Sequence, residues 1–148
     1  MIHLQLVTLS GVKFDQDVYE VILPTLEGQI GVLTDHMPLI SAATAGIISI
    51  RKNQKDPDTA MEHFATFGGV IEVADNLLRV LVDEADHGDN INEKEAQDAL
   101  ERAEKMRSEA KDEKSLEHAR ELIDRSAVRL QVAKLHHRSR QGHRQGQP

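Results

Sequence analysis

The stretch GGVIEVADNLLRVLVDEADHGDNINEKEAQDALERAEKM, from Gly68 to Met106, changes its hydrophobic period near its centre. As far as Val82, aliphatic residues alternate with polar ones or form short runs, which is typical of β-strands. After Asp83 the stretch is rich in Ala, Glu, Lys and Arg, which favour helix. The stretch therefore predicts a chain with a β half followed by a helical half.

Turn-forming residues divide the first half into at least seven short apolar segments. Ser10-Gly11, Pro24 and Asp75-Asn76 are among these turns. Short strands at such close spacing predict an antiparallel sandwich or barrel. The pair Gly68-Gly69 lies inside one expected strand, and there we predict a bulge or a tight crossing between strands.

The second half is expected to form two antiparallel helices. Asn92 followed by Glu95, or Asn90 followed by Glu93, offers a capping-box-like start. Two apolar stripes at helical spacing follow: Ala96, Ala99, Leu100, Ala103 and Met106, then Leu116, Ala119, Ile123, Leu130 and Ala133. We predict a β domain over residues 1–86, a helical hairpin over 87–137 joined around 108–115, and a disordered basic tail over 138–148.

Such a hairpin buries little apolar area, because its seams are rich in alanine. Ordering it costs roughly 1 to 2 kcal/mol per residue. It therefore needs a third surface, either its own β domain or a partner, and we expect it to be able to exchange between them.

The composition restricts the possible partners. The net charge of −7 and the aromatic content of 3% argue against nucleic acid. The absence of cysteine excludes disulfides and thiolate metal sites, and fits a reducing compartment. No apolar run is long enough to span a bilayer, and MIHLQLVTL lacks the features of a signal peptide, so we expect the protein to stay where it is made.

Four segments carry a resemblance to a known family: IHLQLV (2–7), EVILPTLEGQIGVLTDHMPLISAATAGIISI (20–50), FGGVIEVADNLLRVLVDEA (67–85) and RLQVAKLH (129–136). In order and spacing they resemble the ε subunits of bacterial and chloroplast F-type ATP synthases. The resemblance implies an N-terminal β-sandwich of about ten strands and a C-terminal two-helix hairpin. It also implies a non-catalytic subunit of the central rotor, which needs no cofactor and no homo-oligomer.

The resemblance further implies the partners and the location. The β domain would bind the γ subunit and sit on the ring of c subunits, peripheral to the membrane. The side would be the cytoplasmic face of a bacterial membrane or the stromal face of the thylakoid. The hairpin would lie compact on the sandwich or extend towards the catalytic α and β subunits, where it opposes ATP hydrolysis.

Site residues follow from the resemblance at matching positions. The loop that would contact the c ring contains Glu27, Gly28, Gln29 and Ile30, with Gln29 where the family usually has an acid. The residues that would face γ are Thr8, His36 and Met37. In Asp35-His36-Met37-Pro38, aspartate and methionine replace the family's glycine and alanine. Arg125 and Arg129 would contact an acidic segment of the catalytic β subunit.

No nucleotide or metal site is expected. Some relatives bind ATP through Ile/Leu-Asp-x-x-Arg-Ala, but here Asn92 replaces the aspartate and Glu95 replaces the arginine. A carboxylate at that place repels phosphate, so we predict weak or absent ATP binding. His136, His137 and His143 are not at the i,i+4 spacing of a helical metal pair, and we expect only adventitious metal binding.

Two other classes of function remain open from the residues. One is a free-standing β-sandwich adaptor whose hairpin binds some other protein. The other is a small hydrolase built on Asp35, His36 and Glu27, which is disfavoured because the motifs supply no set of nucleophile, base and orienting group.

Overall fold

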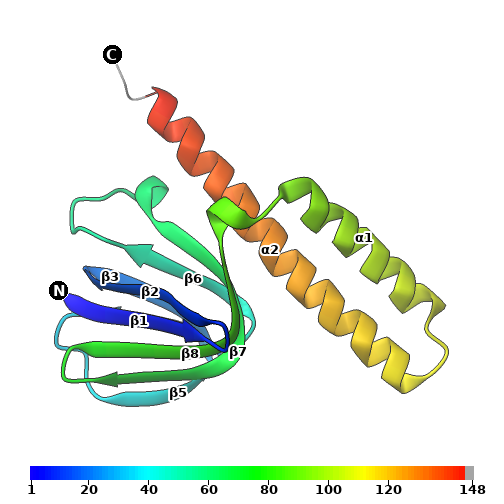
Figure 1. Cartoon of the computed structure of the whole chain (residues 1–148), viewed down its shortest axis with the longest axis horizontal. Coiled ribbons are helices and arrows are strands. Elements are labelled where there is room, and N and C mark those ends of the chain that lie inside the picture. The colour runs from blue at the N-terminus through cyan, green and yellow to red at the C-terminus, as the bar shows by residue number, and fades with distance from the viewer. Residues whose placement is uncertain (146–148) are drawn as a thin grey trace.

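The computed structural model describes residues 1–145 and consists of a β-sandwich followed by two long helices (Figure 1). The strands are β1 (Ile2–Thr8), β2 (Gly11–Val18), β3 (Glu20–Thr25), β4 (Gly28–Leu33), β5 (Leu39–Ala43), β6 (Gly46–Arg51), β7 (Glu62–Ala74) and β8 (Leu77–His87). The helices are the short 3-10 turns η1 (Asp58–Ala60) and η2 (Gly88–Asn90), and the α-helices α1 (Glu93–Glu109) and α2 (Glu113–Gln145). The predicted order of a sandwich followed by a helical hairpin is confirmed.

The strands form one folded sheet in the order β2-β1-β8-β7-β5-β3-β4, with β6 paired to β3 and β7. Eight strands are present in the described residues, fewer than the ten or so expected, because β7 and β8 are 13 and 11 residues long and cross from one layer to the other. One pairing also departs from the antiparallel expectation, since β1 runs parallel to β8. A parallel pair needs a long connection, and here the rest of the sandwich provides it.

The Gly68-Gly69 pair is the point where β7 changes partner, from β6 before it to β5 after it. The register with β8 does not shift there, because Phe67 pairs with Glu84 and Gly69 pairs with Val82. Gly69 has φ +155°, and a Cβ on it would lie 2.0 Å from the Leu81 carbonyl oxygen. Of the two predicted alternatives, the structure therefore has the tight crossing and not the bulge.

The crossing also changes which residues face the core. In β7 an even-numbered residue, Phe64, faces the core before the glycines, whereas the odd-numbered Ile71 and Val73 face it after them. The alternation of inward and outward side chains therefore shifts by one residue at the glycines. In β8 the alternation shifts in the same way opposite the glycines, between Val82 and Ala85. The outer residues of the two strands consequently belong to two different surfaces, one under α2 and one on the opposite part of the sheet.

Aliphatic side chains make up nearly all of the sandwich core, as the composition requires. The largest side chains that are fully buried include Ile2, Leu4, Leu6, Leu23, Ile48, Ile50, Ile71 and Leu78. Each such side chain stabilises the fold by roughly 1.5 to 3 kcal/mol relative to an exposed one. The sandwich is thus the independently packed part of the chain.

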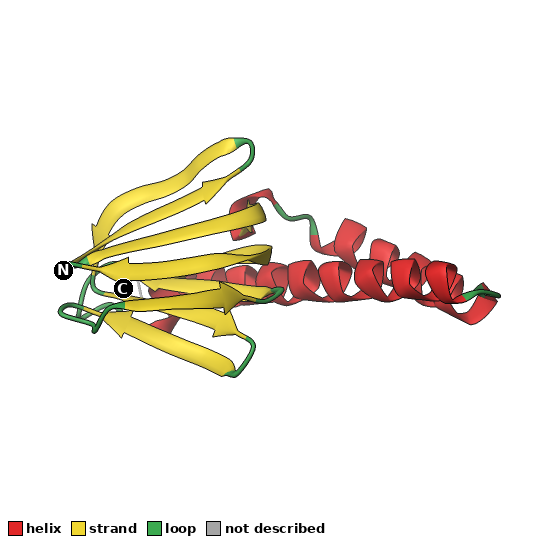
Figure 2. Ribbon diagram, turned by 90° about the horizontal axis from the view of Figure 1, so that it is seen from below, coloured by secondary structure: helices red, strands yellow, loops and turns green. Residues whose placement is uncertain are grey.

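The helices begin where capping residues predict. The side-chain oxygen of Asn92 accepts a hydrogen bond from the Glu95 N–H at 3.0 Å, which confirms the first of the two expected starts. Asp112 accepts one from the Ser115 N–H at 2.7 Å at the start of α2, and this bond holds the pKa of Asp112 below its ordinary value. α1 packs along α2, and both project beyond the sandwich (Figures 1 and 2).

The prediction of a disordered tail from residue 138 is wrong for most of its length, because α2 continues to Gln145. This end of α2 passes close to η1, where Gly142 lies near Thr59. The sequence could not show that contact, since η1 is far away along the chain. Residues 146–148 lie outside the described part of the chain, and no helix within residues 1–145 is long and apolar enough to cross a membrane.

Candidate functional site

The contact between α2 and the sandwich follows the outer face of the first part of β7. Alternate side chains of a strand point to the same face, so His63, Ala65 and Phe67 form one row. Phe67 and Ala65 pack in one cluster with Val132 of α2. His63 shares a cavity with His136, one helical turn further along α2. The row of β7 therefore meets successive turns of α2.

A cluster of charges, which we call the arginine cluster, fixes one end of this contact. The Arg125 guanidinium is 3.1 Å from a Glu84 oxygen, and Arg129 is 2.9 Å from both Glu84 and Asp86. Both guanidiniums also lie over the Phe67 ring, 5.1 and 4.8 Å from its centroid. Exposed ion pairs contribute about 0 to 1 kcal/mol each, and cation–π contacts about 0.5 to 2 kcal/mol. The cluster thus provides a moderate, releasable attachment.

The apolar part of the contact is small. Among the described residues, Ala65, Phe67 and Val132 form its buried centre, and Ile47, Ile91 and Val128 are partly buried around it. The sandwich has its own, separate core. Losing the contact with α2 would therefore leave the core of the sandwich intact.

The predicted c-ring loop is the turn between β3 and β4. The Thr25 hydroxyl donates to the Gly28 carbonyl at 2.6 Å and accepts from the Glu27 N–H at 3.3 Å. Gly28 has φ +114°, which favours glycine. Glu27, Gly28 and Gln29 are exposed, whereas Ile30 packs against the core.

Leu26 is the residue of this turn that the sequence reasoning missed. It is 78% exposed, at the tip between two strands. The available signal was a large aliphatic residue inside a turn, where polar residues are usual. The turn therefore presents an apolar side chain beside the Glu27 carboxylate.

The residues predicted to face γ lie in two different settings. Met37 is 72% exposed in the loop between β4 and β5, where the neighbouring His36 ring lies 2.7 Å from the Met37 carbonyl oxygen. Thr8 is only 8% exposed, and its hydroxyl lies 3.0 Å from the Ser10 hydroxyl in the turn after β1. The structure thus leaves Met37 accessible and gives Thr8 a role inside its own turn.

Asp35 has an unusual backbone conformation in this loop. Its φ is +62°, a left-handed conformation that aspartate and asparagine accept more readily than most residues. The Asn76 side chain accepts from the Asp35 N–H at 2.6 Å and donates to the Asp35 carboxylate at 3.0 Å. This pair joins the loop to the turn between β7 and β8.

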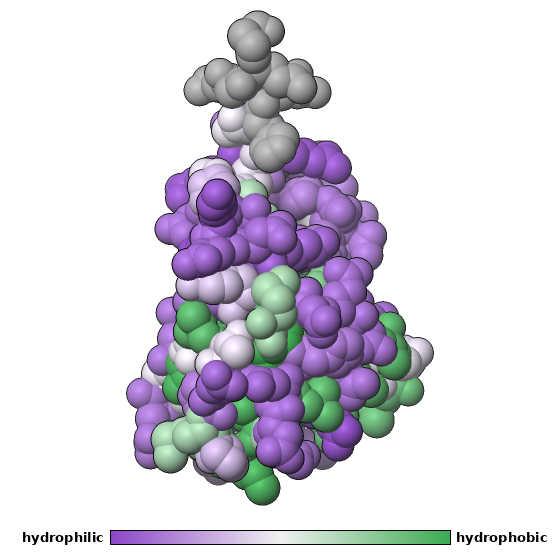
Figure 3. Space-filling view, turned by 90° about the vertical axis from the view of Figure 1, so that its left-hand side faces the viewer, coloured by the Kyte–Doolittle hydropathy of each residue, from purple (hydrophilic) through white to green (hydrophobic). Residues whose placement is uncertain are grey.

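A row of apolar side chains crosses the outer face of the sheet, and it was not predicted from the sequence. Cross-strand pairing places its members side by side, and we call them the outer apolar row: Ala42, Val70, Leu81, Val7 and Val12. Ile40 beside it is 76% exposed. Figure 3 shows, on the side of the molecule that faces the viewer, further apolar residues among the hydrophilic ones over the sandwich. Contiguous exposed apolar surface of this kind marks interaction sites.

The three residues of the hydrolase alternative are not brought together. Glu27 precedes β4, whereas Asp35 and His36 follow it, so the length of a six-residue strand separates them, roughly 20 Å. The Asp35 carboxylate is bonded to Asn76. The structure therefore assembles no catalytic set from these residues.

The segment that corresponds to the ATP motif lines a cavity of about 340 Å³ between η2, α1 and α2, together with Asp86 and Arg129. The Asn92 side chain is occupied as the helix cap, and Glu95 contributes a carboxylate to the wall. Weak or absent ATP binding stays a prediction. Within the described residues, no group of three or more His, Asp or Glu side chains is arranged to hold a metal, and the side chain of His143 lies outside that part.

The described residues thus form an eight-stranded β-sandwich followed by a two-helix hairpin, whose second helix packs against the sandwich. The family described as ATP synthase, Delta/Epsilon chain, beta-sandwich domain matches residues 1–88. The chain belongs to the ATP synthase epsilon chain family. It is accordingly a non-catalytic subunit of that complex.

Two relatives illustrate the similarity. The chain is 35% identical over 130 residues to the chloroplastic ATP synthase epsilon chain of Lotus japonicus, covering 88% of this chain and 94% of that protein. It is 33% identical over 132 residues to the ATP synthase epsilon chain of Gloeobacter violaceus, covering 89% and 96%. The match therefore includes the helical hairpin as well as the sandwich.

Solved structures show the same fold at lower identity. A chain of the Euglena gracilis mitochondrial ATP synthase, from an OSCP/F1/c-ring structure, matches with a TM-score of 0.76 and 23% identity over 91% of this chain and 81% of that one. A chain of the Tetrahymena thermophila central stalk and c-ring structure matches with a TM-score of 0.58 and 18% identity over 90% and 95%.

Proposed function

We propose that the protein couples the rotation of a c-subunit ring to the catalytic head of an ATP synthase and restrains ATP hydrolysis through its hairpin. It works as a peripheral subunit of the rotor, on the cytoplasmic face of a bacterial membrane or the stromal face of a thylakoid. The observation that carries the regulatory part is the arginine cluster. There, charged residues of α2 predicted to bind the catalytic head are held by the protein's own sandwich.

The proposed γ-binding surface is the outer apolar row together with His36 and Met37, which lie in the loop before β5. A monomer rarely leaves such a row in water, and an apolar surface suits a permanent partner within a complex. Thr8 supports this surface by fixing the turn next to β2. Charge contributes little to it, since four of the five members of the row carry aliphatic branched side chains.

The turn from Thr25 to Gly28 is the proposed contact with the c ring. Its backbone is fixed by the two Thr25 hydrogen bonds, so the exposed Leu26 and Glu27 keep a defined position. Leu26 would bury apolar area against the ring, and Glu27 would stand where a charge pairing is still possible although Gln29 replaces the family's acid. Rigid presentation lowers the entropic cost of binding.

Regulation follows from competition for Arg125 and Arg129. Glu84 and Asp86 hold both arginines in the docked hairpin, and an acidic segment of the catalytic β subunit would hold them in the extended one. The docked and the extended hairpin both pair the same guanidiniums with carboxylates, so the free energies of the two states can be similar. A modest change in the acids of the sandwich or of the β subunit then shifts the equilibrium between docked and extended hairpin.

The test is binding to a purified complex of α, β and γ subunits. The full chain should form a stable complex, and Leu81→Arg in the outer apolar row should weaken it at least about tenfold, which corresponds to about 1.4 kcal/mol. Arg79→Gln, on the same strand and also exposed, is the matched control and should bind normally. Failure of the unaltered chain to bind would favour the adaptor alternative instead.

A further inference from the structure

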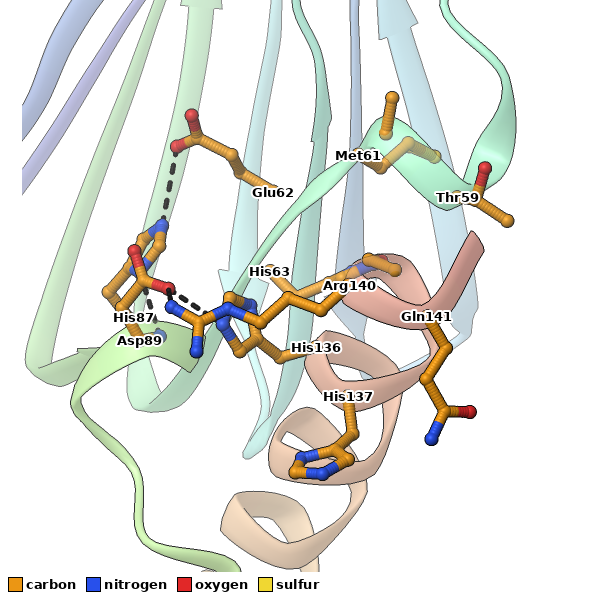
Figure 4. Close-up of a pocket in the computed structure, with 12 residues that line it drawn as sticks. Thr59, Met61, Glu62, His63, His87, Asp89, His136, His137, Arg140 and Gln141 are labelled. Atoms are coloured by element: carbon orange, nitrogen blue, oxygen red, sulfur yellow. Dashed lines mark hydrogen bonds and ion pairs between the residues drawn. The ribbon is translucent and has the colours of Figure 1, made fainter. Parts of the chain in front are cut away.

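The C-terminal part of α2 is attached to the sandwich by histidines. A cavity of about 700 Å³ lies between the start of β7, the end of β8, η2 and α2 (Figure 4). His63 enters it from β7, His87 from β8 and His136 from α2. The arginine cluster and these three histidines therefore hold two successive stretches of the same helix.

Two of the histidines meet Asp89 of η2. The His136 Nε2 atom lies 2.7 Å from an Asp89 carboxylate oxygen. The His87 Nδ1 atom accepts a hydrogen bond from the Asp89 N–H at 3.0 Å, and the His87 Nε2 atom is 3.4 Å from a Glu62 oxygen. The backbone of Gly88 also lies close to His136, since a Cβ on Gly88 would be 3.1 Å from the His136 Cβ. α2 is thus in close contact with η2.

His63 has a different environment from the other two. Its Nδ1 atom lies 2.9 Å from the Ser49 hydroxyl, and it forms no ion pair within the described residues. Burial, followed by the nearby rings of His136 and His87, lowers the pKa of His63 below its ordinary value. A proton on His63 would therefore be placed beside two other groups that can become cations.

The acids around the cavity are already paired with other groups. Glu62 is bonded to Lys52 as well as facing His87. Asp89 has Arg140 of α2 at 3.6 Å in addition to its histidine contacts.

On its other side, His63 borders a second cavity with four charged groups: Glu20, Arg51, Asp58 and Arg138. Arg51 lies 3.1 Å from Glu20 and 2.5 Å from Asp58, so these charges balance one another. Neither cavity offers a carboxylate dedicated to His63.

We propose that His63, His87 and His136 form a pH-sensitive latch, which holds the C-terminal part of α2 on the sandwich at neutral pH and releases it in mildly acidic solution. When the three rings are neutral, they pack together: the His63 ring lies beside the Ser49 hydroxyl, and the His87 ring makes an edge-on contact with Phe64 at 4.9 Å. Acidification adds a proton to His63, whose ring lies close to the rings of His87 and His136, and undocking moves the His136 ring on α2 away from His63 on the sandwich.

The direction follows from linkage. The folded-state pKa of His63 is lowered, so neutral His63 favours docking at pH values above its ordinary pKa near 6.5. This contribution to docking is lost as the pH falls through the lowered pKa. If His63 stays neutral while docked, the docking equilibrium weakens by up to about tenfold between pH of about 7.5 and about 5.5. Partial protonation of the docked state makes the change smaller.

A single thiol under α2 can measure this equilibrium in the full chain, because the protein has no cysteine of its own. Val132 is fully buried against Ala65 and Phe67, so Val132→Cys reacts with a disulfide reagent only when α2 moves away. The rate at each pH is divided by the rate of the same variant unfolded in urea, which removes the intrinsic pH dependence of the thiol. The resulting protection factor should fall by about threefold to tenfold from pH of about 7.5 to about 5.5.

Adding His63→Gln to this variant should abolish the fall, because the residue is then neutral at every pH. His63→Leu, also neutral, gives the same expectation if glutamine itself loosens the docked helix. His118→Gln is the matched control on the exposed side of α2, and it should keep the full fall. A protection factor that does not change with pH, or a full fall in both His63 variants, would overturn the latch.

The latch is a property of the isolated chain, and only its effect on ATP hydrolysis rests on the proposed function. If the protection factor falls with pH but the chain does not bind the complex of α, β and γ, the latch stands and the proposed function fails. If the chain binds but the protection factor is constant, the proposed function stands and the latch fails.

Discussion

Removing the acids of the arginine cluster, as Glu84→Gln with Asp86→Asn, should loosen the docked hairpin without damaging the sandwich. The change removes the acceptor charges of three contacts of 2.9 to 3.1 Å between partly exposed side chains. Each such contact is worth roughly 0.2 to 1 kcal/mol, so the loss from three contacts is about 0.6 to 3 kcal/mol in total. The stacking of both guanidiniums over Phe67 remains.

A loss of this size shifts the ratio of docked to undocked hairpin by a factor of roughly 3 to 150. The assay is the reaction of Val132→Cys with a disulfide reagent at pH of about 7.5, the upper end of the range used for the latch. The protection factor of the double variant should be lower than that of the parent by this factor. Salt should lower the parent's protection as well, because these pairs are partly screened.

Glu72→Gln is the matched control, since Glu72 pairs with Arg79 at 3.9 Å on the other surface of the sheet. It should leave the protection factor unchanged. Equal protection in the double variant and the parent would refute the reasoning, because it would mean that the arginine cluster does not hold α2.

Three further predictions concern other parts of the chain. The hydrogen bond to Asp17, aided by a second carboxylate, raises the pKa of His3, so an NMR titration of the His3 ring should have its midpoint above 6.5. The stability that this contact contributes should be complete below pH of about 6.5 and lost as the pH rises through the raised pKa. Gly69→Ala should lower the free energy of unfolding by about 3 kcal/mol or more, because its Cβ would overlap the Leu81 carbonyl; Gly11→Ala, with positive φ but no atom within 4 Å, should cost only about 1 kcal/mol in the same urea titration. Isothermal titration of the full chain with ATP should give no heat of binding at low micromolar protein, and a saturable signal there would show that the departures from the family motif do not matter.

Much of the architecture could be predicted because it depends on local patterns. The period of two located the strands, the alanine-rich stripes located the hairpin, and the Asn92 cap fixed where its first helix begins. The change of hydrophobic period after Val82 gave the order of the domains. These features depend on residues that are close together in the sequence, so a single sequence is sufficient to predict them.

The surfaces could not be predicted because they depend on contacts between distant segments. The alternation of inward and outward side chains in β7 shifts by one residue at Gly68-Gly69, so the outer residues of the strand lie on two surfaces. A regular alternating pattern in the sequence therefore did not predict which of them contact α2. The outer apolar row exists only through the cross-strand register. The helical conformation of residues 138–145 and the exposure of Leu26 likewise depend on the assembled fold.

In the proposed mechanism, Glu84 and Asp86 compete with the catalytic head for Arg125 and Arg129. The most direct measurement is the ATP hydrolysis rate of a purified complex of α, β and γ, with the full chain, with Glu84→Gln and Asp86→Asn together, or with Arg125→Ala and Arg129→Ala together. With all three forms bound to saturation, the variant lacking the acids should inhibit hydrolysis more strongly than the full chain, and the variant lacking the arginines should inhibit it more weakly. Equal inhibition by all three forms would contradict it.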